Sequence, residues 1–224
     1  MTDYTAQLTE MIGPSIEPAS GGPAKQLVVF LHGLGSDGND LIDLGTMFAR
    51  HLPDAAFLSP NAPFPFDMAP YGRQWFSLQT VSNVSALSGV KAVAPILNAF
   101  LDQELDKRGL TNADLALIGF SQGTMMSLHV APRRDTPVAA VVGYSGRLIA
   151  PELLGKELKS RPPVLLVHGE ADPVVPFVSM RLSEEALAGE GIDVKAVARP
   201  GLQHGIDAVG LEEGIAFVAR AFKK

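Results

Sequence analysis

A serine between two glycines, Gly119-Phe120-Ser121-Gln122-Gly123, directly follows the apolar run 115–118. A tight turn between a strand and a helix lifts a serine hydroxyl clear of the sheet, and small flanking residues avoid clashes there. The pattern alone arises by chance in about one chain in ten of this length. The apolar run before it and the helical pattern of 122–130 after it supply the strand and helix of a nucleophile elbow. Ser121 is therefore the candidate nucleophile.

A serine hydroxyl is a weak nucleophile near neutral pH, so it needs a histidine as general base and a carboxylate that orients the histidine. Asp172 lies in the loop after the apolar run 164–167, and His204 lies in a glycine-containing turn after the run 194–199. The order serine, aspartate, histidine, with each partner after a later strand, is the order expected after such an elbow. The sequence therefore predicts a catalytic triad of Ser121, Asp172 and His204.

Other titratable residues compete for these roles. Glu170 lies two residues before Asp172, and the longer glutamate side chain together with the following Pro173 favours Asp172. The remaining histidines have other expected roles: His168 ends its strand and supports the carboxylate loop, His129 is buried or structural, His51 is solvated at a helix end, and His32 belongs to the motif described next.

The early motif His32-Gly33-Leu34-Gly35 follows the apolar run 26–31 and has the features of an oxyanion loop. Acyl transfer builds negative charge on the former carbonyl oxygen, and one backbone N–H donor aimed at that oxygen contributes about 3 kcal/mol. In hydrolases with a nucleophile elbow, one donor follows the nucleophile and the other follows a His-Gly motif after an early strand. These donors are the N–H groups of Gln122 and Leu34. A plain turn that caps the next helix through Asp37 or Asn39 is the alternative, and one loop can do both.

The elements that must position these residues form an α/β pattern. Near-continuous apolar runs indicate strands buried on both faces of a mostly parallel sheet, and helical patterns alternate with them, as in a doubly wound fold. An antiparallel edge hairpin over 8–17 would precede the strand at 26–31. We expect strands at 26–31, 55–58, 114–120, 138–144, 164–168 and 194–199, and helices at 39–51, 84–107, 122–131, 178–189 and 206–222.

The segment 61–83 interrupts this alternation with a long, aromatic, proline-containing loop. A loop of this length in a compact domain needs a reason. One interpretation is that its apolar residues fold back onto the core. The other is that Trp75, Phe76 and Leu78 line an apolar substrate groove beside the carboxyl edge of the sheet, where α/β proteins bind ligands.

Composition limits the remaining functions. The chain has 224 residues, which we interpret as a single domain over 1–224, and it has no cysteine, so disulfides, thiolate metal sites and a cysteine nucleophile are excluded. A net charge of −6 without a basic stripe argues against nucleic-acid partners and anionic membranes. No phosphate, dinucleotide or metal-binding motif occurs, so no cofactor and no metal are expected. The absence of a signal-peptide pattern and of a long apolar run predicts a cytoplasmic protein without integral membrane association.

The chain resembles the phospholipase/carboxylesterase family of α/β-hydrolases, which includes the acyl-protein thioesterases. The motifs that carry the resemblance span nearly the whole chain: His32-Gly33-Leu34-Gly35, Arg73-Gln74-Trp75-Phe76, the elbow, His168-Gly169-Glu170-Ala171-Asp172, and His204. The resemblance implies the same triad and oxyanion donors, and it places the Trp75 region and Val175 beside the acyl pocket. Thr124 stands where many members carry another glycine, and Gln203 precedes the histidine where glycine is frequent.

The expected protein is a single-domain α/β-hydrolase without a large cap domain, acting as a cofactor-free serine carboxylesterase. Its substrates would be short- to medium-chain esters of small molecules, because so short a chain leaves little room for a cap. The same residues would also serve an acyl-protein thioesterase or a lysophospholipase. A non-catalytic ligand-binding protein on this scaffold is the alternative of another class. The apolar stretch 64–75 would serve equally as a homodimer contact.

Overall fold

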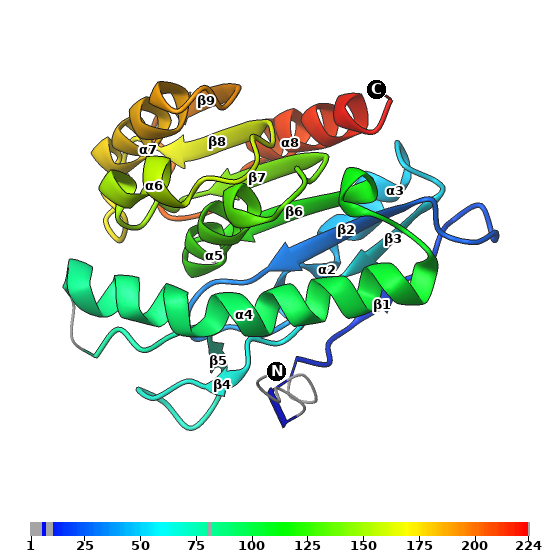
Figure 1. Ribbon diagram of the computed structural model, residues 1–224, viewed down its shortest axis with the longest axis horizontal. Helices are drawn as coiled ribbons and strands as arrows, with labels where there is room; N and C mark the ends of the chain where they lie inside the picture. Colours follow the sequence, from blue (N-terminus) through cyan, green and yellow to red (C-terminus); the bar gives the residue numbers. More distant parts are fainter. Residues whose placement is uncertain (1–5, 8–10, 80–81, 224) are drawn as a thin grey trace.

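A seven-stranded sheet forms the centre of the protein in the computed structural model, which describes residues 6–7, 11–79 and 82–223 (Figure 1). The strand order is β1-β3-β2-β6-β7-β8-β9; β1 pairs antiparallel with β3, and all other neighbouring pairs are parallel. The carboxyl ends of the parallel strands therefore meet at one edge. The strands are β1 (Ser15–Ile16), β2 (Gln26–Leu31), β3 (Ala55–Leu58), β6 (Leu115–Phe120), β7 (Ala140–Tyr144), β8 (Val164–Gly169) and β9 (Val194–Arg199).

Helices cover both faces of this sheet. The α-helices are α2 (Asn39–Ile42), α3 (Leu44–Ala49), α4 (Asn83–Arg108), α5 (Gln122–Val130), α6 (Leu154–Glu157), α7 (Val178–Gly189) and α8 (Ala208–Ala221). Short 3-10 turns occur at Asn112–Asp114, Ala131–Arg133 and Pro151–Leu153. Buried residues of α4, α5 and α7 share one core cluster, whereas those of α2, α3 and α8 share the other. The layered arrangement is an α/β fold with a mostly parallel sheet and helices on both faces, as the sequence predicted.

The side chains of β2 point alternately to the two faces of the sheet, and both faces are covered by helices. Leu27, Val29 and Leu31 pack into the α4 and α5 core, whereas Val28 and Phe30 pack into the α3 and α8 core. Successive side chains of a strand point to opposite faces, so a strand between two helical layers must be apolar throughout. This explains why the apolar runs predicted the parallel strands so directly.

The first predicted helix and the N-terminal hairpin differ from expectation. The range 39–51 contains two short helices, α2 and α3, because i→i+3 hydrogen bonds such as Thr46 N–H to the Asp43 carbonyl tighten the chain between them. In place of the hairpin predicted over 8–17, the described residues of this segment form one short strand, β1, which pairs antiparallel with β3 at the edge of the sheet. Residues 8–10 lie outside the described part of the chain.

The long loop between β3 and α4 contains a small second sheet that the sequence did not predict. β4 (Phe64–Pro65) pairs antiparallel with β5 (Arg73–Gln74), with Phe64 opposite Gln74. Two-residue strands that include a proline carry no alternating pattern, so this hairpin leaves no period-two signal.

Helix α4 is the longest helix among the described residues and meets a membrane criterion that the sequence analysis did not anticipate. By length and composition alone, an 18-residue window of α4 could cross a membrane, and 39% of that window is buried inside the protein. Its buried residues, among them Val90, Leu97 and Leu101, pack into the core that α5 shares. An apolar helix that covers a sheet passes the same test, and α4 occupies that position here (Figure 1).

Candidate active site

Ser121 lies at the sharp turn between β6 and α5, at the carboxyl edge of the sheet. Its backbone has φ 53° and ψ −113°, a conformation that a non-glycine residue adopts only when its surroundings enforce it. A Cβ on Gly119 would lie 2.4 Å from the Thr124 nitrogen, and one on Gly123 would lie 1.8 Å from the Leu31 carbonyl oxygen. Both glycines of the motif are therefore required by close backbone approach, as a nucleophile elbow predicts.

Thr124, the departure from the family's glycine, packs beneath the elbow. Its hydroxyl oxygen lies 2.8 Å from the carbonyl oxygens of both Gly119 and Tyr144. The Tyr144 carbonyl also accepts the Ser121 N–H at 2.9 Å. The threonine thus links the ends of β6 and β7 at the position where the chain turns into α5.

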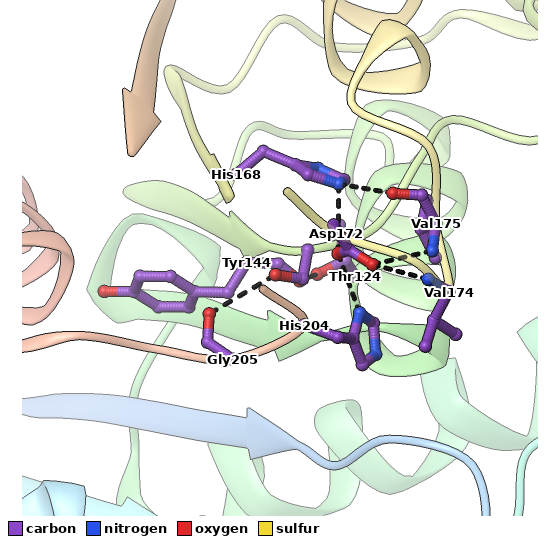
Figure 2. Close-up of polar contacts among 9 residues, drawn as sticks. Thr124, Tyr144, His168, Asp172, Val174, Val175, His204 and Gly205 are labelled. Carbon is purple, nitrogen blue, oxygen red and sulfur yellow. Dashed lines mark hydrogen bonds and ion pairs between the residues drawn. The ribbon is translucent and has the colours of Figure 1, made fainter. Parts of the chain in front are cut away.

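The structure pairs Asp172 with His204 (Figure 2). His204 Nδ1 donates to Asp172 Oδ2 at 2.8 Å, and the N–H groups of Val174 and Val175 donate to Asp172 Oδ1 at 2.8 and 2.9 Å. Glu170, the alternative carboxylate, is exposed and has no such bond to His204 among the described contacts. Asp172 therefore occupies the position of the orienting carboxylate.

Hydrogen bonding keeps the Asp172 carboxylate ionised. Burial alone would raise its pKa, but the bonds from His204, Val175 and Val174 outweigh that effect and hold the pKa below its ordinary value. An ionised carboxylate only accepts hydrogen bonds, so His204 carries its proton on Nδ1. The Nε2 lone pair of His204 is then available to accept a proton.

His168 supports the carboxylate from the far side (Figure 2). Its Nε2 lies 2.8 Å from the Val175 carbonyl oxygen and 3.2 Å from Asp172 Oδ2. Both partners are acceptors, so Nε2 carries a proton that it shares between them. This fully buried histidine lies one residue before the end of β8, which the sequence predicted to end at His168, and it fixes the carboxylate loop.

The loop that carries His204 packs closely on the end of β8. A Cβ on Gly169 would lie 2.2 Å from the Leu202 carbonyl oxygen, so glycine is required for this approach. The His204 ring lies 4.9 Å, centroid to centroid, from the ring of Phe120, the residue before Ser121. No hydrogen bond joins the Ser121 hydroxyl to His204 among the described residues, and such bonds are often long until substrate binds. The candidate base and nucleophile share one edge of the sheet.

The two predicted oxyanion donors lie on loops that meet beside Ser121. A Cβ on Gly33 would lie 3.5 Å from the Ser121 Cβ, which places the 33–35 loop next to the elbow. Gln122 is the first residue of α5, and the N–H groups of a first helical turn have no partner within the helix. In the described part of the chain, the Leu34 N–H likewise donates to no backbone carbonyl.

The expected pocket residues lie deeper than predicted. Trp75 is 0% exposed, and Phe76 and Val175 are also buried, while Leu78 packs against the same core cluster from a half-buried position. Trp75 therefore offers no surface to a substrate here, because its indole is enclosed and its Nε1 donates to the His32 carbonyl. The exposed apolar residues of this segment are Phe64, Met68 and Tyr71. Trp75 and Phe76 pack into the core cluster that α4 and α5 share.

Known proteins with the same architecture identify the family. A sequence model described as Phospholipase/Carboxylesterase matches residues 14–221. The chain belongs to the phospholipase/carboxylesterase family. It is 31% identical to esterase YpfH of Escherichia coli over 185 residues, covering 83% of this chain and 78% of the relative. It is 28% identical to acyl-protein thioesterase 1 of Gibberella zeae, covering 93% and 95%. The crystal structure of esterase PE8 superposes with a TM-score of 0.91 at 40% identity, covering 95% and 99%.

Family membership and these relatives support a hydrolase of carboxylic esters or thioesters.

Sequence reasoning missed the Gln122 side chain, whose amide bonds to the backbone of Trp75 and Phe76. The signal that the sequence offered was a glutamine, with an amide that can both donate and accept, directly after the candidate nucleophile. Among the described residues, no group of three or more histidine, aspartate or glutamate side chains is placed to hold a metal ion.

Proposed function

We propose that this family member is a serine esterase that forms an acyl-enzyme on Ser121. The observation that carries the proposal is the Asp172–His204 pair, which lies at the same sheet edge as a serine held in an elbow conformation. A histidine oriented by a buried carboxylate beside a strained serine is the arrangement that activates a hydroxyl for acyl transfer.

In the first step, the Ser121 oxygen attacks the ester carbonyl carbon while His204 Nε2 takes the hydroxyl proton. The carbonyl π electrons move onto oxygen, where the Leu34 and Gln122 N–H groups stabilise the negative charge. When the tetrahedral intermediate collapses, the bond to the alkoxy oxygen breaks and His204 donates its proton to the leaving alcohol. Asp172 stays ionised and stabilises the imidazolium.

In the second step, His204 takes a proton from water as the water oxygen attacks the acyl carbon. Collapse of the second intermediate releases the carboxylic acid and returns the proton to Ser121. The short helix α6 (Leu154–Glu157) is the one α-helix between β7 and β8 in the described chain, so no cap domain is inserted there. From this lack of a cap we infer an open groove and a preference for short- to medium-chain small-molecule esters. We place the enzyme in the cytoplasm, without nucleic-acid partners.

A thioester substrate is the second candidate, because the Gibberella zeae relative is named as an acyl-protein thioesterase. Thioester cleavage needs the same nucleophile and base, with a thiolate in place of the alkoxide as leaving group. The two are separated by kcat/KM on matched p-nitrophenyl esters and acyl thioesters of C2 to C16 chains, with Ser121→Ala as control. We expect the highest ester kcat/KM between C2 and C8 and no turnover by Ser121→Ala. A rate that rises steadily toward C16 would refute the chain-length proposal.

A further inference from the structure

The two candidate oxyanion donors lie on loops that are far apart in the sequence, and one buried polar network joins them. We infer that the side chains of His32, Trp75 and Gln122 form a scaffold that aims the Leu34 and Gln122 N–H groups at the reacting carbonyl. These are positioning residues, since none of them donates its side chain to the substrate. The inference rests on the proposed function.

His32 fixes the orientation of the peptide that supplies the first donor. Its Nδ1 lies 2.7 Å from the Gly33 carbonyl oxygen, and its Nε2 accepts the Ala62 N–H at 3.0 Å. Because Nε2 must accept, the neutral ring carries its proton on Nδ1 and donates it to the Gly33 carbonyl. The carbonyl and N–H of a trans peptide point in opposite directions. Holding the Gly33 carbonyl on His32 therefore turns the Leu34 N–H away from the ring.

Trp75 joins this loop to the second donor. Its indole Nε1 donates to the His32 carbonyl at 3.0 Å, and its backbone N–H donates to Gln122 Oε1 at 2.9 Å. Gln122 Nε2 donates to the Phe76 carbonyl at 2.7 Å. The residue that supplies one oxyanion N–H is thus clamped by its own side chain to the segment that holds the other.

Because the side chains of His32, Trp75 and Gln122 are buried, their hydrogen bonds fix the orientation of the peptides that they contact. His32 and Trp75 are both 0% exposed and Gln122 is 1% exposed, so a group that loses its partner cannot turn to water instead. Burial also lowers the pKa of His32, which keeps the ring neutral while its Nε2 accepts from Ala62.

A second set of bonds holds the oxyanion loop in place independently of the His32 side chain. Gly35 N–H donates to the Arg73 carbonyl at 2.9 Å, and Arg73 N–H donates to the Ser36 carbonyl at 2.7 Å. The loop is therefore paired with β5 through its backbone. Replacing His32 should alter the aim of the Gly33–Leu34 peptide without releasing the whole loop, so variants at this position can be compared as folded enzymes.

The matched variants His32→Asn and His32→Gln separate the two functions of the His32 ring, which are donation to the Gly33 carbonyl and acceptance from the Ala62 N–H. The asparagine amide nitrogen reaches the place of Nδ1 and can still donate to Gly33, whereas the glutamine amide oxygen reaches the place of Nε2 and can only replace the acceptor for Ala62. We expect His32→Gln to lower kcat about 100-fold, as loss of an oxyanion donor does, with KM within about threefold of wild type. His32→Asn should keep kcat within about tenfold of wild type.

Trp75→Phe tests the scaffold from its other side, since it keeps a buried ring but removes the indole donor to His32. We expect a kcat about tenfold lower with KM unchanged, at a temperature where circular dichroism shows the variant folded. Equal kcat losses in the two His32 variants, or losses confined to KM, would overturn the scaffold while wild-type turnover stays intact. If wild type hydrolyses neither esters nor thioesters, the proposed function itself fails and the scaffold with it.

Discussion

The loops after β2 and β9 each bring a histidine to the same site, but the two rings have opposite surroundings. His204 retains some solvent exposure and bonds to an ionised carboxylate, whereas His32 is enclosed and its ring nitrogens bond to the backbone of Gly33 and Ala62. A carboxylate partner stabilises the imidazolium, and burial among neutral groups disfavours it. The same side chain can therefore carry a proton during catalysis in one loop and hold a peptide plane in the other.

Asp172→Asn should produce the largest loss of activity, because it removes the ionised carboxylate that distinguishes the surroundings of His204 from those of His32. An amide in place of the carboxylate permits the wrong tautomer and no longer stabilises the imidazolium, so we expect kcat to fall about 10⁴-fold. Initial rates of p-nitrophenyl ester hydrolysis by wild type and variant measure this fall in kcat. Glu170→Gln is the matched control, since that exposed carboxylate lies two residues away and should leave kcat unchanged. Equal losses in the two variants would remove Asp172 from its assigned role.

His129 offers an independent measure of a buried histidine without a carboxylate bond. Its Nδ1 has no hydrogen-bond partner among the residues that the structure describes, and burial, assisted by Arg133, lowers its pKa to about 4. Because the unfolded chain binds a proton more readily, wild-type stability should fall as the pH drops below 6.5, until about pH 4. At pH 5 the replacement His129→Met should remove about 2 kcal/mol of that loss.

Urea unfolding of both proteins at pH 7 and pH 5 measures this difference. If wild type and His129→Met lose the same free energy of unfolding between pH 7 and pH 5, His129 does not resist protonation in the folded protein.

His168 produces the smallest expected effect, because it acts on Asp172 rather than on the substrate. Losing its proton donor in His168→Leu should lower kcat about tenfold with KM unchanged, since the Asp172 carboxylate can then rotate. A glutamine amide nitrogen reaches the place of Nε2, so His168→Gln should recover most of the loss. If glutamine restores thermal stability but not kcat, His168 contributes only to packing.

Much of the fold followed from the sequence because burial on both faces of a parallel sheet requires apolar runs. Strands β2, β3 and β9 and helix α7 begin and end where those runs predicted. The elbow was also predictable, since close backbone approach admits only glycine at positions 119 and 123. The order of the loops carrying Asp172 and His204 then placed them at one edge.

The part that could not be predicted depends on contacts between distant segments. An aromatic residue in a long loop is equally consistent with a substrate groove and with the core. The buried position of Trp75 and the bond from its indole to the His32 carbonyl are visible only in the structure. The β4–β5 hairpin has no periodic pattern, and the Gln122 clamp joins segments more than 40 residues apart. Side-chain bonds to backbone groups leave no signature in residue spacing.

The central claim, that Ser121 is the acylated nucleophile, is tested most directly by a fluorophosphonate probe on the native protein. The serine oxygen displaces fluoride and forms a stable bond to phosphorus, which peptide mass spectrometry then locates. We expect one adduct on the peptide that contains Ser121, loss of ester hydrolysis in proportion to labelling, and no adduct in Ser121→Ala. Labelling of another residue, or hydrolysis that survives complete labelling, would contradict the claim.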